Sequence, residues 1–425
     1  MKTTLLLLSI LLLVSCAPDM ENTIGNQEDY NVFLVAKQPK TTSKYFELWN
    51  TKIRPDSIQL TSFAIVGGEY TRYFKETGDI TYLKKAEQSL KKAVAVAAVG
   101  KETYLRALAR NYIAQHRFKE ALVLANEAME LGGGANESRS LLFDVHMELG
   151  NYKVAEAYLE SIKNLSDFGY IIRLSKWNDY KGDLNTTIAF MEKAKEKAIS
   201  AKSKELMLWS FTNLADYYGH AGRIAESYQY YLSALALDPS NAYAKKGIAW
   251  IVFSHDKNPE EALRILDSVT ATYKAPDYFL LKADIADYMG DDNTRLENLD
   301  SYFTTVQNEA YGDMYNGYNI NLFLEETGQY EKAVQLSMRE VANRPTPESY
   351  SMLGYSYLKN DQLDKAKKIM DEFVYGKTFE PALCYQAAAV YSASGELKKV
   401  QILKKDLVGS IYELGPGMEK NIKAL

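Results

Sequence analysis

Cysteine, proline and histidine are scarce in this chain, and each shortage excludes a class of protein. The 425 residues include only 2 cysteines, 10 prolines and 4 histidines. The cysteines, Cys16 and Cys384, are too few for a disulfide framework. No two histidines lie three to five residues apart and no Cys-x-x-Cys occurs, so neither a metal site nor another cofactor is predicted. With so few prolines and only 24 glycines, the composition is not that of a collagen-like or disordered chain.

Positive charge is not in excess either. The chain has 50 Lys and Arg against 55 Asp and Glu, a net charge of −5, so nucleic acid is not an expected partner. The run Gly132–Gly134 is not followed by the Lys and Ser or Thr of a phosphate-binding loop, and no Gly-x-Ser-x-Gly sequence occurs. No catalytic residue set is therefore predicted, and we expect a protein that is not an enzyme.

Long apolar runs are missing except near the N-terminus. After Lys2, residues 5–14 are apolar apart from Ser9. About twenty residues are needed for a helix to span a bilayer, so ten are too few. A positive start followed by a short apolar run is typical of a signal peptide, which we assign to residues 1–15.

The apolar run ends in Leu13-Val14-Ser15-Cys16. This sequence resembles the lipobox of bacterial lipoproteins, which implies cleavage before Cys16 and a diacylglycerol on its thiol. An ordinary signal peptide with an incidental cysteine is the alternative. Ala17 follows the cysteine where an aspartate would signal retention, which implies the outer membrane, with the side it faces left open. Residues 16–29 are then expected to form the lipidated end and a flexible, polar tether.

What the chain does contain is a repeat. Gly or a polar residue is followed two positions later by an aromatic or aliphatic residue and three positions after that by a small one, as in Gly150 to Ala155 and Gly328 to Ala333. The separations between successive small positions range from 32 to 40 residues, near the period of 34 for one helix-turn-helix repeat. The small positions are residues 86, 121, 155, 187, 227, 262, 295, 333, 366 and 400.

The fifth copy shows why this spacing produces a helical hairpin. Phe211, Leu214, Ala215 and Tyr218 fall three and four apart, so they share one helix face. Gly222 permits a tight turn after that helix. A second face follows, and a proline at position 239 stops it; this face comprises Ile224, Ser227, Tyr231 and Ala234. Each hairpin buries only part of its apolar surface, so the units must stack, and each unit is expected to contact mainly its neighbours.

These residues resemble the tetratricopeptide repeat family over about residues 58–407. The resemblance implies an all-α superhelical solenoid of about ten antiparallel helix-turn-helix units. Residues 30–57 are expected to cap its start, and residues 408–425 form a C-terminal tail. A lipobox followed by such a divergent, Tyr-rich array is similar in style to lipoproteins of Bacteroidota.

In the resembling family, partners lie along the concave side of the solenoid, against inner positions of each first helix. At the matching positions of this chain, acids outnumber Lys and Arg and aromatic residues are frequent, which are features of binding surfaces. An ordinary solvated helix face is the alternative. The candidate partner-binding residues are Arg106, Arg110, Asp144, Glu148, Lys176, Asp179, Tyr180, Trp209, Asp216, His220, Ile251, His255, Asp284, Asp287, Tyr288, Tyr315, Tyr318, Glu325, Glu326, Tyr355 and Tyr385.

The leading hypothesis is a non-catalytic, lipid-anchored scaffold that binds a protein or peptide, basic or polar in character, at the bacterial cell envelope. One alternative is a glycan- or nutrient-capture lipoprotein, although the nearly unbroken period leaves little room for the insertions such proteins carry. Another is an accessory factor of outer-membrane assembly or secretion. The residues do not name the partner.

Overall fold

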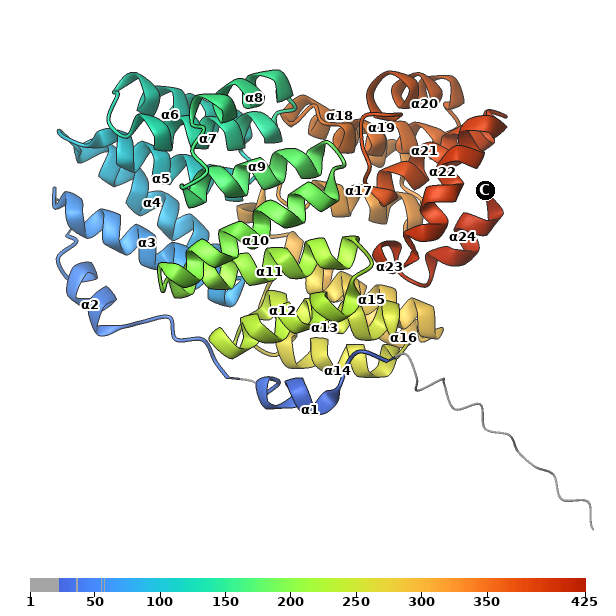
Figure 1. The fold of residues 1–425 in the computed structure, drawn as a ribbon, viewed down its shortest axis with the longest axis horizontal. Helices are drawn as coiled ribbons and strands as arrows, with labels where there is room; N and C mark the ends of the chain where they lie inside the picture. The colour runs from blue at the N-terminus through green and yellow to red at the C-terminus, as the bar shows by residue number, and fades with distance from the viewer. Residues whose placement is uncertain (1–22, 36, 55, 57) are drawn as a thin grey trace, which may run out of the picture.

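The computed structural model describes residues 23–35, 37–54, 56 and 58–425, and it is built from helices joined by short turns (Figure 1). Within these residues there is no strand. The predicted all-α solenoid of helix-turn-helix units is confirmed. In this part of the chain no helix combines the length and the apolar character that crossing a bilayer requires.

Ten antiparallel helix pairs follow one another and are called units 1 to 10. In chain order the pairs are α3 (Leu60–Thr77) with α4 (Ile80–Val96), α5 (Lys101–Ala114) with α6 (Phe118–Glu130), α7 (Ala135–Glu148) with α8 (Tyr152–Ser161), α9 (Phe168–Tyr180) with α10 (Leu184–Ser200), α11 (Lys204–His220) with α12 (Ile224–Leu237), α13 (Ala242–Trp250) with α14 (Pro259–Thr270), α15 (Asp277–Met289) with α16 (Asp292–Val306), α17 (Asn316–Glu325) with α18 (Tyr330–Asn343), α19 (Pro347–Lys359) with α20 (Leu363–Ile369), and α21 (Pro381–Ala393) with α22 (Leu397–Gly409).

The small residues of the repeat lie where the two helices of a unit meet. In unit 5, Ala215 and Ser227 are almost completely buried, and the aromatic and aliphatic residues of the two predicted faces pack around them. Nine of the ten small positions are buried. The exception is Arg295 in unit 7, whose guanidinium forms ion pairs with Glu326 and Asp287 and so finds partners at the edge of the solenoid.

Two units contain a π-turn. Ile251–His255 (η3) extends α13 in unit 6, and Met370–Val374 (η5) extends α20 in unit 9. A π-turn inserts one residue into the helical repeat, so side chains on either side of it face directions that a regular helix would not give. Short 3-10 turns also occur at Asn31–Phe33 (η2) and Glu309–Tyr311 (η4).

The solenoid winds far enough for later units to touch earlier ones, which differs from the expectation that units contact mainly their neighbours. The backbone N–H of Lys274, before unit 7, donates to the carbonyl of Thr77 in unit 1 at 2.7 Å. The amide of Asn343, at the end of unit 8, donates to the carbonyl of His116 in unit 2 at 3.0 Å. Hydrogen bonds between successive superhelical turns of the solenoid therefore add to the stacking of neighbouring units.

The glycine between the two helices of a unit allows the chain to bend and also allows a distant unit to approach closely. Gly78 has a φ of +66°, and a Cβ built on it would lie 2.6 Å from the backbone nitrogen of Ala275. Gly150 has a φ of +69°, and a Cβ there would collide with the carbonyl oxygen of Pro345. Any side chain at these positions would force the two turns of the solenoid apart.

The N-terminal segment packs against the middle of the solenoid. The hydroxyl of Tyr30, which ends α1 (Gln27–Tyr30), donates to Glu261 of α14 at 2.8 Å, and the amides of Ile24 and Gly25 donate to Asp256 at 3.0 and 2.8 Å. The flexible tether expected for residues 16–29 is therefore wrong for residues 23–29. Backbone N–H groups of this segment donate to buried side chains of units 5 and 6. The polar composition of the segment does not reveal these contacts.

The two ends of the chain close the solenoid in different ways. Helix α2 (Lys44–Asn50) packs on α3, where Phe46 contacts the rings of Tyr70 and Tyr73. The C-terminal tail forms α23 (Ile411–Leu414) and α24 (Met418–Ala424). Its Tyr412 carbonyl accepts hydrogen bonds from Trp250 at 3.1 Å and Ser254 at 2.7 Å, so the tail reaches back to unit 6.

Candidate functional site

A cavity of about 720 Å³ opens on the inner face of units 5 to 8, and we call it the acidic chamber. Its walls are the first helices of four consecutive units, α11, α13, α15 and α17, with Tyr231 of α12 as an additional contact. The lining residues are Asn213, Asp216, Tyr217, His220, Tyr231, Tyr243, Lys246, Gly247, Trp250, Asp277, Leu280, Leu281, Asp284, Tyr318, Asn321, Leu322, Glu325 and Glu326. Five carboxylates face one lysine, so the chamber is acidic.

One glycine shapes this wall. Gly247 lies in α13 under the ring of Tyr231, and a Cβ on it would overlap that ring. The close approach lets the Tyr231 hydroxyl reach Asp216, to which it donates at 2.5 Å, while the Tyr243 hydroxyl donates to the other oxygen of Asp216 at 2.8 Å. Two tyrosine rings are thus fixed at one end of the chamber.

The chamber brings together six of the candidate residues, which lie far apart in the sequence. These residues are Asp216, His220, Asp284, Tyr318, Glu325 and Glu326. They come from units 5, 7 and 8, and the regular stacking of first helices places them on one wall. Their role in binding a partner stays a prediction.

Several candidates in units 2 to 4 are instead bound to neighbouring protein groups, whereas Asp179 is exposed. Arg106 is buried and donates to the carbonyl of Gly133 at 2.7 Å, so it holds the turn before unit 3 and is not exposed as expected. Asp144 pairs with Arg173 at 2.6 Å, and Glu148 pairs with Lys176 at 3.0 Å. The charges of adjacent first helices therefore neutralise one another here.

Three further candidates in these units and in unit 5 lie outside the chamber. Arg110 stays exposed, although burial and the charge of Arg173 lower its pKa and Asp144 raises it. Tyr180 stacks on Tyr152 with 4.1 Å between ring centroids, in a groove between turns. Trp209 is 39% exposed and contacts Phe168 edge-on.

The remaining candidates of units 7 to 10 surround the chamber without lining it. Tyr355 is buried, and its hydroxyl donates to Glu325 at 3.0 Å, so its main surroundings are the core of the C-terminal units. Tyr315 packs against Tyr318 with 5.7 Å between centroids. The others are either exposed near α15 and α16 or partly buried in unit 10, and they are Asp287, Tyr288 and Tyr385.

Unit 6 is where the inner-face assignment fails. Ile251 was assigned to the inner face but is fully buried in the core, and His255 pairs with its neighbour Asp256 at 2.7 Å. The π-turn that begins at Ile251 rotates these side chains, and the chamber is lined instead by residues of the preceding α-helix. The chamber residues that the sequence did not single out are Asn213, Tyr217, Tyr243, Lys246, Gly247, Trp250, Asp277, Leu280, Leu281, Asn321 and Leu322.

The carboxylate of Asp284 stands apart from the other acids of the chamber. Among the described residues it has neither a hydrogen bond nor an ion pair. Its side chain is exposed to the cavity, but the surrounding walls desolvate it, and this desolvation, together with the charges of Glu326 and Asp287, raises its pKa to about 7. A carboxyl group with a strongly perturbed pKa inside a cavity is a feature of binding and catalytic sites.

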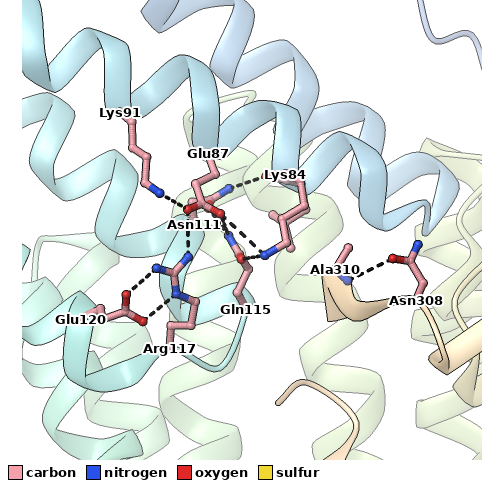
Figure 2. Close-up of polar contacts among 10 residues, drawn as sticks. Lys84, Glu87, Lys91, Asn111, Gln115, Arg117, Glu120, Asn308 and Ala310 are labelled. Atoms are coloured by element: carbon pink, nitrogen blue, oxygen red, sulfur yellow. Dashed lines mark hydrogen bonds and ion pairs between the residues drawn. The ribbon is translucent and has the colours of Figure 1, made fainter. Parts of the chain in front are cut away.

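A buried acid elsewhere in the chain shows the opposite behaviour. Glu87 of α4 accepts hydrogen bonds or ion pairs from Lys91 at 2.5 Å, Arg117 at 2.9 Å and Gln115 at 3.0 Å (Figure 2). Burial alone would raise its pKa, but these donors lower it to about 2. The cluster joins unit 1 to the turn of unit 2, and because its groups satisfy one another it reads as structural.

His220 connects the chamber to the C-terminal tail. Its Nδ1 lies 2.5 Å from a carboxylate oxygen of Glu413. Burial lowers its pKa, but the hydrogen bond and charge of Glu413 outweigh this and raise it to about 9. Among the described residues, no group of three or more His, Cys, Asp or Glu side chains is placed to hold a metal ion. The candidate lipidation residue Cys16 lies outside the described residues.

The comparisons with known proteins agree with the repeat. Residues 210–241 and 347–375 match the family model described as tetratricopeptide repeat. These segments are α11–α12 of unit 5 and most of unit 9. No curated protein matches the sequence.

Solved structures with similar architecture share little sequence with this chain. An IFIT1 monomeric mutant with Gppp-AAAA has 13% identity and a TM-score of 0.45, covering 73% of this chain and 70% of that one. A tetratricopeptide repeat protein from Parabacteroides merdae has 14% identity and a TM-score of 0.39, covering 58% and 93%. Pseudomonas aeruginosa pilF has 13% identity and a TM-score of 0.38, covering 50% and 96%. Ten stacked helix pairs and the two matched segments together support tetratricopeptide repeats as the building unit of this chain.

Proposed function

We propose that this chain is a non-catalytic, lipid-anchored scaffold that binds a protein or peptide partner on the inner face of its solenoid, at the outer membrane of a bacterial cell. Tetratricopeptide repeats generally act in protein interaction, and the acidic chamber is the surface that we propose for it. The observation that carries the proposal is Asp284, a carboxylate without a protein partner in a cavity built by four consecutive units.

The lipid anchor is proposed from Leu13-Val14-Ser15-Cys16. Eight residue steps separate Cys16 from Ile24, which is already bound to Asp256. A chain of that length reaches roughly 30 Å when fully extended. An anchor at Cys16 would therefore keep the edge formed by α12, η3 and α14 close to the membrane surface.

Metabolic labelling with palmitate in a bacterium that processes lipoproteins tests the anchor. We expect the wild-type chain to incorporate label and to sediment with outer membranes, and Cys16→Ala to do neither. Cys384→Ala is the matched control, because it removes the other thiol, which lies partly buried on α21. Equal labelling of Cys16→Ala and the wild type would exclude the anchor.

Crosslinking in native membranes tests the scaffold. A photoreactive amino acid at Asn321, which lines the chamber, should capture a polypeptide, and the same group at the exposed Lys193 of α10 should not capture it. Capture from Lys193 alone would move the binding surface to the outer face. No captured polypeptide from either position would contradict the scaffold itself.

A further inference from the structure

The acidic chamber has the size of a site for a side chain and its flanking residues. Its volume of about 720 Å³ lies within the range of small-ligand pockets and is too small for a folded domain. A protein partner can therefore enter it only with an extended segment or a protruding side chain.

Within the described residues, four of the five lining acids have a hydrogen-bond donor or a cation as a partner, and one carboxylate has neither. Asp216 accepts two tyrosine hydroxyls, and Asp277 pairs with Lys246 at 2.7 Å. Glu325 pairs with Lys359 at 3.1 Å, and Glu326 pairs with Arg295. These contacts satisfy four of the five lining acids. Only Asp284 lacks a cation or a donor, so an incoming positive group would complete the set.

Aromatic faces lie on the walls around this carboxylate. Tyr318 is 44% exposed and projects from α17. Trp250 of α13 is held in place by the hydrogen bond from its indole to Tyr412. Aromatic rings attract cations and pack against the aliphatic stems of long basic side chains. A lysine or arginine side chain offers both a cation for Asp284 and an aliphatic stem for the aromatic rings. An acidic or purely apolar side chain would leave Asp284 unpaired.

We propose that the chamber receives a lysine or arginine side chain of the partner polypeptide, with its cation paired to Asp284 and its stem against Tyr318. This inference rests on the proposed scaffold function and names the chemistry of its partner. Charge-assisted hydrogen bonds between a basic side chain and a carboxylate are among the stronger polar contacts in proteins. The site thereby selects for charge and length of side chain, not for a folded shape.

Fluorescence anisotropy with the full chain tests this assignment. The probes are labelled, unstructured peptides of identical sequence that carry either lysine, arginine or glutamine at the central position. We expect the basic peptides to bind and the glutamine peptide to bind at least tenfold more weakly. Salt should weaken the basic peptides, and raising the pH from 6 to 8 should strengthen them, because Asp284 becomes ionised over this range. The charged groups around Asp284 are Asp287 on its own helix, Glu326 on the adjacent wall and Arg295 of α16.

Substitution of the carboxylate separates charge recognition from general attraction. Asp284→Asn should weaken the basic peptides at least tenfold and remove their pH dependence. Asp300→Asn on the exposed side of α16 makes the same change in net charge outside the chamber and should leave binding nearly unchanged. Equal binding by Asp284→Asn and the wild type, or equal binding of the glutamine peptide, would overturn the proposal.

Two further outcomes decide between related explanations. Free spermidine or free arginine that binds as tightly as the basic peptides and displaces them would identify a small organic cation as the occupant, and the peptide proposal would be wrong. A polypeptide crosslinked equally well to wild type and Asp284→Asn would refute the basic side chain while leaving the scaffold intact. The thermal midpoint of each variant shows whether a lost signal reflects loss of folding.

Discussion

The inner faces of units 2 to 4 and of units 5 to 8 are built from equivalent positions of the repeat, yet the acids on them are satisfied to different extents. In units 2 to 4, Asp144 and Glu148 pair with Arg173 and Lys176 of the following first helix. In units 5 to 8, three of the lining acids also have cationic partners, but Asp284 has none in the described part of the chain, and a cavity of about 720 Å³ remains beside it. A position on the inner face therefore does not by itself make a residue available for binding, because its charge can be paired with a charge of the next unit.

Glu87, which is buried, and Asp284, which is exposed to the chamber, make the same comparison at single residues. Several donors surround Glu87 and hold its pKa near 2, whereas burial and like charge hold that of Asp284 near 7. The first contributes to the stability of the fold, and the second costs stability as long as no cation binds. A carboxylate that destabilises its own fold is a reasonable indicator of a functional site.

The largest expected effect distinguishes two tyrosines that the sequence treats alike. Tyr355→Ala should lower the free energy of unfolding by about 3 kcal/mol or more, because it empties a space in the core of units 8 to 10. Tyr318→Ala should lower it by less than about 1 kcal/mol, because that ring is half exposed. Urea unfolding followed by circular dichroism measures both. A stable Tyr355→Ala variant would show that its ring is not needed for packing.

The second prediction concerns the paired acid. Glu87→Gln should lose about 2–3 kcal/mol of stability at pH 7, since the depressed pKa corresponds to that much favourable interaction of the charged form. The loss should shrink as pH falls from 4.5 toward 2, where the wild-type carboxylate also becomes protonated. Glu120→Gln, which removes an exposed partner of Arg117, should lose less than about 1 kcal/mol. An equal loss in both variants would contradict the central role of Glu87.

The third prediction is that removing the charge of Asp284 stabilises the fold, whereas removing that of Glu87 destabilises it. The pKa of Asp284 is raised from 3.8 to about 7 by folding, so the folded state binds the proton more tightly, and wild-type stability falls as pH rises through this interval. Asp284→Asn should therefore have a higher thermal midpoint than the wild type at pH 8 and the same midpoint below pH 4. Asp300→Asn should show no such pH dependence. Destabilisation of Asp284→Asn at pH 8 would mean that Asp284 has a structural partner.

The smallest expected effect concerns the tail that borders the chamber. Folding raises the pKa of His220 from 6.5 to about 9, so its contribution is complete below pH 6.5 and is lost as pH rises through 9. Hydrogen exchange of residues 410–414 should be slower in the wild type than in His220→Gln at pH 6.5, and the two proteins should converge near pH 10. The acids that face His220 are Glu413, Glu380, Asp216 and Asp179. Identical exchange at pH 6.5 would show that this ion pair does not hold the tail.

Much of the core was predictable because it follows from short-range spacing. Ala215 and Ser227 are small where the two helices of unit 5 cross, and the structure buries both. The same pattern could not place Ile251, because a π-turn depends on packing rather than on the period of the sequence. It did not separate Tyr318 from Tyr355 either, since both were assigned to the inner face, whereas the structure exposes Tyr318 and buries Tyr355 in the core of the C-terminal units.

The sequence by itself determined the repeat, the turns and the faces of the helices, because each depends on residues fewer than about forty positions apart. Only the tertiary structure decided that unit 1 meets the segment before unit 7, that residues 23–29 dock on units 5 and 6, and that Asp284 has no partner. These features depend on the rotation accumulated over several stacked units. A small rotation per unit is not encoded in any single repeat, yet its sum decides which distant charges meet and which are left for a ligand.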